Sequence, residues 1–213
     1  MATVSNRPSA STVHSPQLVL ASASPRRREL LTQAGFPFRV EVADIPEDPQ
    51  PGEDPIAYVT RLAREKAETV SRRIAEPSVI VLGADTTVVI DGRILGKPDS
   101  PDDAARMLRQ LSGRTHHVMT GVAVVTGEGA NVQALVAAET TAVEFRSLSQ
   151  REIDDYVATG EPMDKAGGYA IQGRAARWIP RIHGCYFNVV GLPLALVSSL
   201  LAALLPANSS ASE

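Results

Sequence analysis

A candidate anion-binding site lies where a short apolar segment leads into a helix. Residues 18–21 predict a buried strand, and Ser24 followed by a proline is typical of a helix N-cap. The same turn carries the hydroxyl group of Ser22 and the guanidinium groups of Arg26 and Arg27. Hydroxyls, guanidinium groups and the free amides of a helix N-terminus together bind anions such as phosphate. The alternative is an ordinary Ser-Pro helix cap with two solvated arginines.

Asp85 is a single acidic residue within an apolar, β-branched segment, residues 78–90. An ionised carboxylate in such surroundings requires a hydrogen-bond partner, a positive charge or a metal ion. Asp85 is therefore a candidate catalytic group or metal ligand, and Thr86 beside it supplies a hydroxyl group. The alternative is a structural aspartate that accepts hydrogen bonds from backbone amides at a β-bulge beside Gly83.

Lys66 lies in the apolar stripe of a predicted helix, between Leu62 and Val70 on the same face. A lysine in that position either extends its ammonium group to the edge of the helix or points it at a negative partner inside a cleft. The helical pattern alone leaves both arrangements open.

Two predicted loops carry further polar candidates. Lys97 lies in a Gly-Lys-Pro sequence, and Lys165 and Gln172 lie in the glycine-rich segment 161–173. Loops of this kind commonly carry functional residues. The alternative for each lysine is a solvated surface position.

These residues together predict cleavage of a phosphoanhydride bond. Basic groups would hold the phosphate oxygens, while the buried carboxylate activates water or binds a divalent cation. The sequence contains no P-loop, no GxGxxG turn and no nucleophile elbow with a paired histidine. His116 and His117 are neighbours on a predicted strand and point to opposite faces, so we expect structural histidines rather than a metal site. Metal-assisted hydrolysis is the predicted reaction class.

The elements that must position these residues alternate between helix and strand, which predicts an α/β fold. A hairpin turn at residues 91–92 is expected after the strand that contains the buried aspartate. The helix start signals are Asp54 and Ser100 as N-caps and a capping box formed by Ser149 and Glu152. The other predicted elements are strands at 36–42, 118–126, 132–145 and 174–190, a turn at 127–129, and helices that end near 75, 112, 160 and 205.

Composition and charge narrow the range of functions. The 213 residues include 21 basic and 24 acidic side chains, and the net charge of −3 disfavours binding of DNA, RNA or an anionic membrane. One cysteine, Cys185, and no zinc-type Cys/His spacing favour a reducing, cytoplasmic location. The longest apolar segment, 192–205, is too short to span a membrane and predicts a core helix. We expect a flexible arm over residues 1–15, one catalytic domain over 16–206 and a flexible tail over 207–213.

The sequence resembles the Maf-like nucleotide pyrophosphatase family from residue 18 to about residue 205, because many motifs occur in order. They are Leu-Ala-Ser-Ala-Ser-Pro-Arg-Arg-Arg-Glu-Leu-Leu (20–31), Arg-Leu-Ala-Arg-Glu-Lys-Ala (61–67), Gly-Ala-Asp-Thr-Thr-Val-Val (83–89), Gly-Lys-Pro (96–98), Leu-Ser-Gly-Arg-Thr-His-His-Val-Met-Thr-Gly-Val (111–122), Gly-Glu-Pro-Met-Asp-Lys-Ala-Gly-Gly-Tyr-Ala-Ile-Gln-Gly (160–173), Gly184 with Tyr186, and Asn-Val-Val-Gly-Leu-Pro-Leu (188–194).

The resemblance implies a fold of the Maf and inosine-triphosphate-pyrophosphatase type, with a mixed twisted sheet, flanking helices and two lobes around a cleft. It implies hydrolysis of a nucleoside triphosphate to the monophosphate and pyrophosphate. The implied cofactor is a divalent cation, Mg²⁺ in the first place and Mn²⁺ or Co²⁺ as alternatives. The family habit and the apolar closing helix also suggest a homodimer.

By the same resemblance, Asp85 matches the catalytic base that deprotonates the attacking water, and Glu47 matches an acidic position near the metal ion. Pro46 before Glu47 departs from the family pattern. The other matched positions fall into two groups. Arg26, Thr86 and Gln172 are associated with substrate selection, and Ser24, Arg27, Lys66 and Lys97 with phosphate contact or support of activity. We add Ser22 and Lys165 to the predicted substrate-binding set and Asp85 to the metal ligands.

Within the family, the intact Tyr-Ala-Ile-Gln-Gly segment resembles the subgroup that acts on dTTP, UTP and modified pyrimidine triphosphates. The amide of Gln172 can donate and accept hydrogen bonds, which suits a pyrimidine edge. One alternative is the subgroup that prefers 7-methyl-GTP. Another is a septum-formation or cell-division regulator that acts by binding DNA or a division partner, although the acidic balance disfavours DNA.

Overall fold

The computed structural model describes residues 17–76, 78–127 and 132–204. The arm expected at 1–15, the tail expected at 207–213 and most of the turn expected at 127–129 lie outside the described residues. Among the helices that are described, none combines the length and apolar character needed to cross a bilayer.

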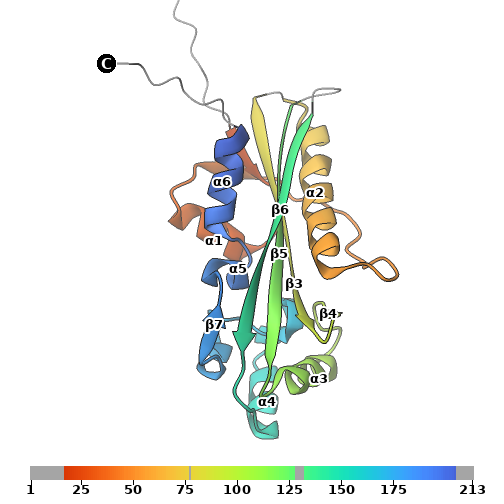
Figure 1. Cartoon of the computed structure of the whole chain (residues 1–213), viewed down its shortest axis with the longest axis vertical. Coiled ribbons are helices and arrows are strands. Elements are labelled where there is room, and N and C mark those ends of the chain that lie inside the picture. The colour runs from red at the N-terminus through yellow and green to blue at the C-terminus, as the bar shows by residue number, and fades with distance from the viewer. Residues whose placement is uncertain (1–16, 77, 128–131, 205–213) are drawn as a thin grey trace, which may run out of the picture.

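A seven-stranded mixed sheet forms the centre of the molecule (Figure 1). Its strands are β1 (Gln17–Leu20), β2 (Phe38–Val40), β3 (Val79–Ile90), β4 (Arg93–Leu95), β5 (Thr115–Thr126), β6 (Gln133–Glu144) and β7 (Arg181–His183). The strand order is β2-β1-β3-β5-β6-β7, and β4 pairs with the end of β3. β1 is parallel to β2 and β3, whereas every other pair is antiparallel.

Six α-helices flank this sheet in the described part of the chain. They are α1 (Pro25–Gln33), α2 (Pro55–Ile74), α3 (Pro101–Leu111), α4 (Gln150–Val157), α5 (Tyr186–Val190) and α6 (Leu194–Leu204). α2 lies on one side of the strands and α1, α5 and α6 lie on the other, while α3 and α4 gather at the opposite end of the long strands (Figure 1).

Alternation along the strands separates the core into distinct clusters. In β3, Leu82 packs with α1 and α6 on one face, while the preceding residue, Val81, packs with α2 on the other. Further along β3, Val88 and Ile90 belong to a third cluster with α3, α4 and the buried Trp178. The expected α/β class with a mixed sheet, flanking helices and two lobes is therefore confirmed.

The local start signals form as predicted. Ser24 and Asp54 cap α1 and α2, Ser100 caps α3, and Ser149 with Glu152 forms the complete capping box of α4. The hairpin between β3 and β4 turns at Asp91 and Gly92, which both have positive φ.

The expected strand over residues 174–190 is wrong. The segment forms a 3₁₀ turn (Arg174–Trp178), the three-residue strand β7 and then helix α5. The physical reason is the buried amide of Asn188, which donates to the Val118 carbonyl at 2.9 Å and to the Thr141 hydroxyl at 2.9 Å. These bonds tie a short helix to the sheet, and an apolar pattern does not reveal them.

The two adjacent histidines point to opposite faces of β5, as predicted. His116 is fully buried and lies 2.7 Å from the hydroxyl of Tyr169, whereas His117 is exposed. Burial lowers the pKa of His116 to about 3, so its ring is neutral at physiological pH. Neither histidine lines the cleft described below.

Two glycines let α2 approach the sheet closely. A Cβ atom at Gly83 would overlap the carbonyl oxygen of Ala63, and one at Gly121 would overlap the carbonyl group of Val59. The helix backbone therefore rests directly on β3 and β5. This close approach brings the side chain of Lys66 down to the level of the strands.

We expect Gly83→Ala to lower the free energy of unfolding by about 3 kcal/mol, near the upper end of what overpacking usually costs. The added methyl group meets helix backbone, which cannot move aside as a side chain can. Chemical denaturation measures the change. Gly96→Ala is the matched control, because a Cβ atom at Gly96 would have no other atom within 4 Å. Equal stability of the two variants would contradict the close packing of α2.

Candidate active site

A cleft of about 920 Å³ lies between the two lobes. Its lining comes from the loop after β1 and the start of α1, the middle of β3, the 3₁₀ turns that follow α4, and the end of α5. All the predicted site residues line this cleft: Ser22, Ser24, Arg26, Arg27, Glu47, Lys66, Asp85, Thr86, Lys97, Lys165 and Gln172. The structure therefore brings together groups that the sequence spreads over 151 positions, from 22 to 172.

The cleft opens where one edge of the sheet is interrupted. On the edge of β3 that faces away from β5, β1 pairs with the first four residues and β4 with the last three. Within the described residues, positions 83–87 consequently have no neighbouring strand on that side. Asp85 and Thr86 thus lie at an opening in the sheet rather than inside a closed ladder of strands.

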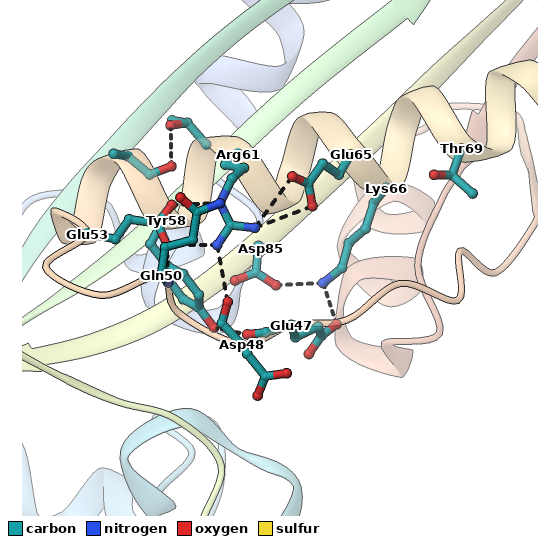
Figure 2. Close-up of polar contacts among 12 residues, drawn as sticks. Glu47, Asp48, Gln50, Glu53, Tyr58, Arg61, Glu65, Lys66, Thr69 and Asp85 are labelled. Carbon is teal, nitrogen blue, oxygen red and sulfur yellow. Dashed lines mark hydrogen bonds and ion pairs between the residues drawn. The ribbon is translucent and has the colours of Figure 1, made fainter.

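An ion cluster with a buried lysine and a buried aspartate forms at this opening (Figure 2). The ammonium nitrogen of Lys66 lies 2.6 Å from Oδ1 of Asp85 and 2.6 Å from Oε1 of Glu47. Lys66 is 6% exposed and Asp85 is 7% exposed, so this lysine does not reach to the helix edge. The β3–β5 register runs without a bulge past Gly83, which excludes the bulge-bound alternative for Asp85.

Glu47 reaches the cluster from an irregular loop, and Pro46 does not move it away. Burial alone would raise the pKa of Glu47, but the hydrogen bond from Lys66 and the charges of Lys66 and Lys97 hold it below the usual value. Lys97 lies 3.5 Å from the other carboxylate oxygen of Glu47 and is largely exposed. Glu47 is therefore ionised at neutral pH.

Tyr58 is a cleft residue that the sequence reasoning missed. Its hydroxyl donates to the backbone carbonyl of Glu47 at 2.8 Å. Burial and the negative charges of Asp85 and Glu47 raise the pKa of Tyr58 to about 12, so it remains a neutral donor. The available signal is its position on the buried face of α2, two turns before Lys66.

Arg27 is buried and bound on all sides, so the solvated alternative is wrong for this residue. Its guanidinium donates to the Gly191 carbonyl at 2.8 Å, to the Ser22 hydroxyl at 3.1 Å and to the Thr86 hydroxyl at 3.0 Å. Burial lowers the pKa of Arg27, although the charge of Asp85 opposes that effect. Arg27 thereby joins the start of α1, the opening in β3 and the end of α5.

Arg26 and Lys165 meet at one carboxylate across the mouth of the cleft. Arg26 lies 3.2 Å from Asp164, and the ammonium group of Lys165 binds both Asp164 and the Glu161 carbonyl. Burial raises the pKa of Asp164, but the contacts with Lys165 and Arg26 bring it below the usual value. The solvated alternative is therefore wrong for Lys165 as well.

Gln172 is exposed at the cleft, and its amide makes no hydrogen bond to the described residues. The segment that carries it is anchored by Glu161, which accepts from the Tyr156 hydroxyl at 2.9 Å and from the Arg174 amide at 3.2 Å. A Cβ atom at Gly173 would overlap the Glu161 carboxylate, so a larger residue there would displace this anchoring side chain. The anchored segment holds the Gln172 amide free for a ligand.

The two carboxylates fit a divalent cation that arrives with a phosphate ligand. Asp85 and Glu47 lie close together, and each contacts the Lys66 nitrogen through only one of its two carboxylate oxygens. Among residues 17–76, 78–127 and 132–204, no group of three or more His, Cys, Asp or Glu side chains could hold a metal ion. Mg²⁺ is usually bound by one or two carboxylates together with substrate phosphates and water, and this donor set matches that habit.

Comparison with known proteins finds a solved structure and sequence relatives that are similar to this chain. The solved structure of the Staphylococcus aureus Ham1 protein aligns with a TM-score of 0.46 and 14% identity over 88% of this chain and 98% of that one. A dTTP/UTP pyrophosphatase of Koribacter versatilis is 54% identical over 184 residues, which cover 86% of this chain and 92% of that protein. A dTTP/UTP pyrophosphatase of Symbiobacterium thermophilum is 56% identical over 178 residues, with 84% and 89% covered.

The family model described as Maf-like protein matches residues 17–204, which include every residue of the cleft. With that match and with relatives above half identity over most of both chains, the chain belongs to the Maf-like protein family.

Proposed function

We propose that this chain hydrolyses dTTP and UTP to the nucleoside monophosphate and pyrophosphate, with a divalent cation as cofactor. The observation that carries the proposal is the Asp85–Lys66–Glu47 cluster, with a buried lysine and a buried aspartate, in a cleft rimmed by cationic groups. The similar proteins named dTTP/UTP pyrophosphatase support the choice of substrate.

The cleft offers several groups to a triphosphate. The exposed ammonium group of Lys97 and the guanidinium of Arg26 can turn toward phosphate oxygens, because each makes only one ion pair with the described residues. Ser24 lies at the N-terminus of α1, where free backbone amides favour an anion. Arg27 does not need to leave its internal partners, since it keeps Ser22 and Thr86 in place at the same wall.

Asp85 is suited to accept the proton of an attacking water molecule. Its Oδ1 atom is held by Lys66, while its Oδ2 atom makes no hydrogen bond to the described residues and is available to water. A fixed carboxylate close to the reacting phosphorus acts as a general base. Lys66 holds Asp85 in position for this step and stabilises the negative charge that develops on the phosphate.

A divalent cation, when bound by Asp85 and Glu47, would neutralise phosphate oxygens and orient the nucleophile. The residues of the chain do the remaining work. Lys97, Arg26 and Lys165 hold the departing pyrophosphate, and the burial of Lys66 and Asp85 limits competing water.

Gln172 is proposed to read the base. Its amide can donate to one group of a pyrimidine edge and accept from another, and no internal hydrogen bond competes with that contact within the described residues. A site whose polar groups pair with one base rejects analogues that leave those groups unpaired. A 7-methylguanine base in place of the pyrimidine would present a different pattern of donors and acceptors to the Gln172 amide.

A homodimer and a cytoplasmic location complete the proposal. α6 places Val197 and Leu201 in the core, so the apolar character of this helix is partly explained within one chain. The net charge of −3 supports a nucleotide rather than a nucleic acid as the partner.

We expect Asp85→Asn to preserve the fold and to lower the rate of pyrophosphate release from dTTP by at least about 10²-fold, as is typical for loss of a general base. A coupled pyrophosphate assay measures the rate, and circular dichroism checks the fold. A variant that turns over at close to the normal rate would remove Asp85 from the mechanism. A cell-division effect that persists in this variant would favour the binding role over the chemistry.

Cleavage between the α and β phosphates should yield monophosphate and pyrophosphate in equal amounts. Chromatographic identification of the products from dTTP, UTP, modified pyrimidine triphosphates and 7-methyl-GTP tests both the bond and the base. Diphosphate with orthophosphate as the products would refute the proposed cleavage, and a preference for 7-methyl-GTP would refute the role given to Gln172.

Neighbouring arginines should respond differently to substitution. Arg26→Ala should raise KM for dTTP with little change in Tm, because its single partner, Asp164, is exposed. Arg27→Met should lower the free energy of unfolding by about 2 kcal/mol or more, because it strands buried partners at Ser22, Thr86 and Gly191. Steady-state kinetics and thermal unfolding of the two variants provide the comparison. The reverse pattern would show that Arg26 is the structural residue.

A further inference from the structure

The loop that carries Glu47 has no regular secondary structure, yet its carboxylate is held 2.6 Å from Lys66. Something outside the cluster must therefore fix the loop. Two consecutive carbonyl groups supply the attachment points. The Glu47 carbonyl accepts from the Tyr58 hydroxyl at 2.8 Å, and the Asp48 carbonyl accepts from the Arg61 guanidinium at 3.2 Å.

Arg61 is itself rigidly held (Figure 2). Its Nε and one terminal nitrogen bind the two carboxylate oxygens of Glu53 at 2.6 and 2.7 Å, a bidentate pair. Glu53 closes the other end of the same loop, because its carboxylate also accepts from the Gln50 amide at 2.9 Å. Glu65 lies 3.4 Å from the remaining nitrogen. Arg61 thus connects Asp48 and Glu53 of the loop with Glu65 on its own helix α2.

The charges in this pair persist over the physiological pH range. The hydrogen bond from Arg61 lowers the pKa of Glu53 to about 2 in spite of partial burial, and Glu53 in turn raises the pKa of Arg61. The Glu53 side chain is 8% exposed and that of Arg61 is 22% exposed, so solvent competes little for the bidentate contact.

Arg61 does not line the cleft, whereas Tyr58, Lys66 and Glu47 do. It lies on the same helix as Lys66, which receives the Glu47 carboxylate. Helix α2 therefore holds the loop backbone through Arg61. Farther along the same helix, Lys66 contacts the carboxylate of Glu47 from that loop. Arg61 is placed to act through Glu47 rather than on substrate.

We propose that Arg61, locked by Glu53, is a positioning residue that sets where Glu47 stands and thereby the affinity of the active site for its divalent cation. The inference rests on the proposed function, because it takes Glu47 and Asp85 as the residues that hold the cation. Groups that orient a metal ligand commonly change metal affinity by 10–100-fold when they are removed.

The decisive measurement is Mn²⁺ binding to the full chain, followed by electron paramagnetic resonance in the presence of a non-hydrolysable α,β-imido analogue of dTTP. We expect Arg61→Met to weaken Mn²⁺ binding by about tenfold or more. The Mg²⁺ concentration for half-maximal pyrophosphate release should rise by a similar factor, while kcat at saturating Mg²⁺ changes less. Excess metal would not restore a rate lost through general damage to the fold.

Arg64→Met is the matched control. Arg64 is also on α2, its ion pair is an exposed one with Glu68, and its side chain is 59% exposed. This variant should bind Mn²⁺ as the wild type does. Glu53→Gln should also weaken Mn²⁺ binding. The double variant should bind little worse than either single variant, because both changes break the same Arg61–Glu53 contact.

Unchanged Mn²⁺ affinity in a folded Arg61→Met variant would overturn the proposal. If that variant does not fold, unchanged affinity in Glu53→Gln would overturn it equally. The same holds if Arg64→Met weakens binding as much as Arg61→Met. A wild-type chain that binds Mn²⁺ with the analogue but releases no pyrophosphate would refute the proposed function and still leave the positioning role of Arg61 measurable.

Discussion

The ammonium group of Lys66 lies between two carboxylates, and the rest of the site depends on that contact. Asp85 and Glu47 come from a central strand and an irregular loop, and their negative charges would repel each other at this separation without a cation between them. Lys66 and Asp85 are almost equally buried, so these two groups compensate for each other's loss of hydration. Removing Lys66 would leave two carboxylates without a counter-charge, whereas removing either carboxylate leaves a neutral ion pair.

The fold provides this contact through backbone packing rather than through side-chain length. Gly83 and Gly121 allow α2 to rest directly on β3 and β5, which sets the height of Lys66 above the sheet. The break between β1 and β4 leaves Asp85 accessible from the side. Stability and function therefore share the same residues, and a change that lifts α2 off the sheet also separates the charges.

Local signals in the sequence were sufficient for much of the fold. The caps at Ser24 and Asp54 and the turn at Asp91 depend on neighbouring residues alone, and all three form as expected. The segment 174–190 could not be predicted in the same way, because the apolar pattern of a buried strand resembles that of a short packed helix. The structure of this segment depends on hydrogen bonds from Asn188 to β5 and β6, which are distant in the sequence.

The sequence was sufficient to predict which residues form the candidate site, but not which contacts they make. An aspartate among apolar residues and a lysine on an apolar helix face each require a partner, and the structure shows that they satisfy each other. No pattern distinguishes Arg26 from Arg27, although one is at the mouth of the cleft and the other is enclosed. Tyr58 and Arg61 were missed because their partners are backbone carbonyl groups, which every residue possesses.

The two lobes are not separate bodies on a linker, because β3, β5 and β6 each run for 12 residues and extend from one lobe into the other. Swinging one lobe toward the other would require the hydrogen-bonded ribbon to bend or change its twist, and three joined strands resist both. The sheet is therefore a stiff framework with a gap at one edge of β3, between β1 and β4. The side chains and loops around this gap adjust to a ligand, while the folded sheet fixes the distance between the two lobes.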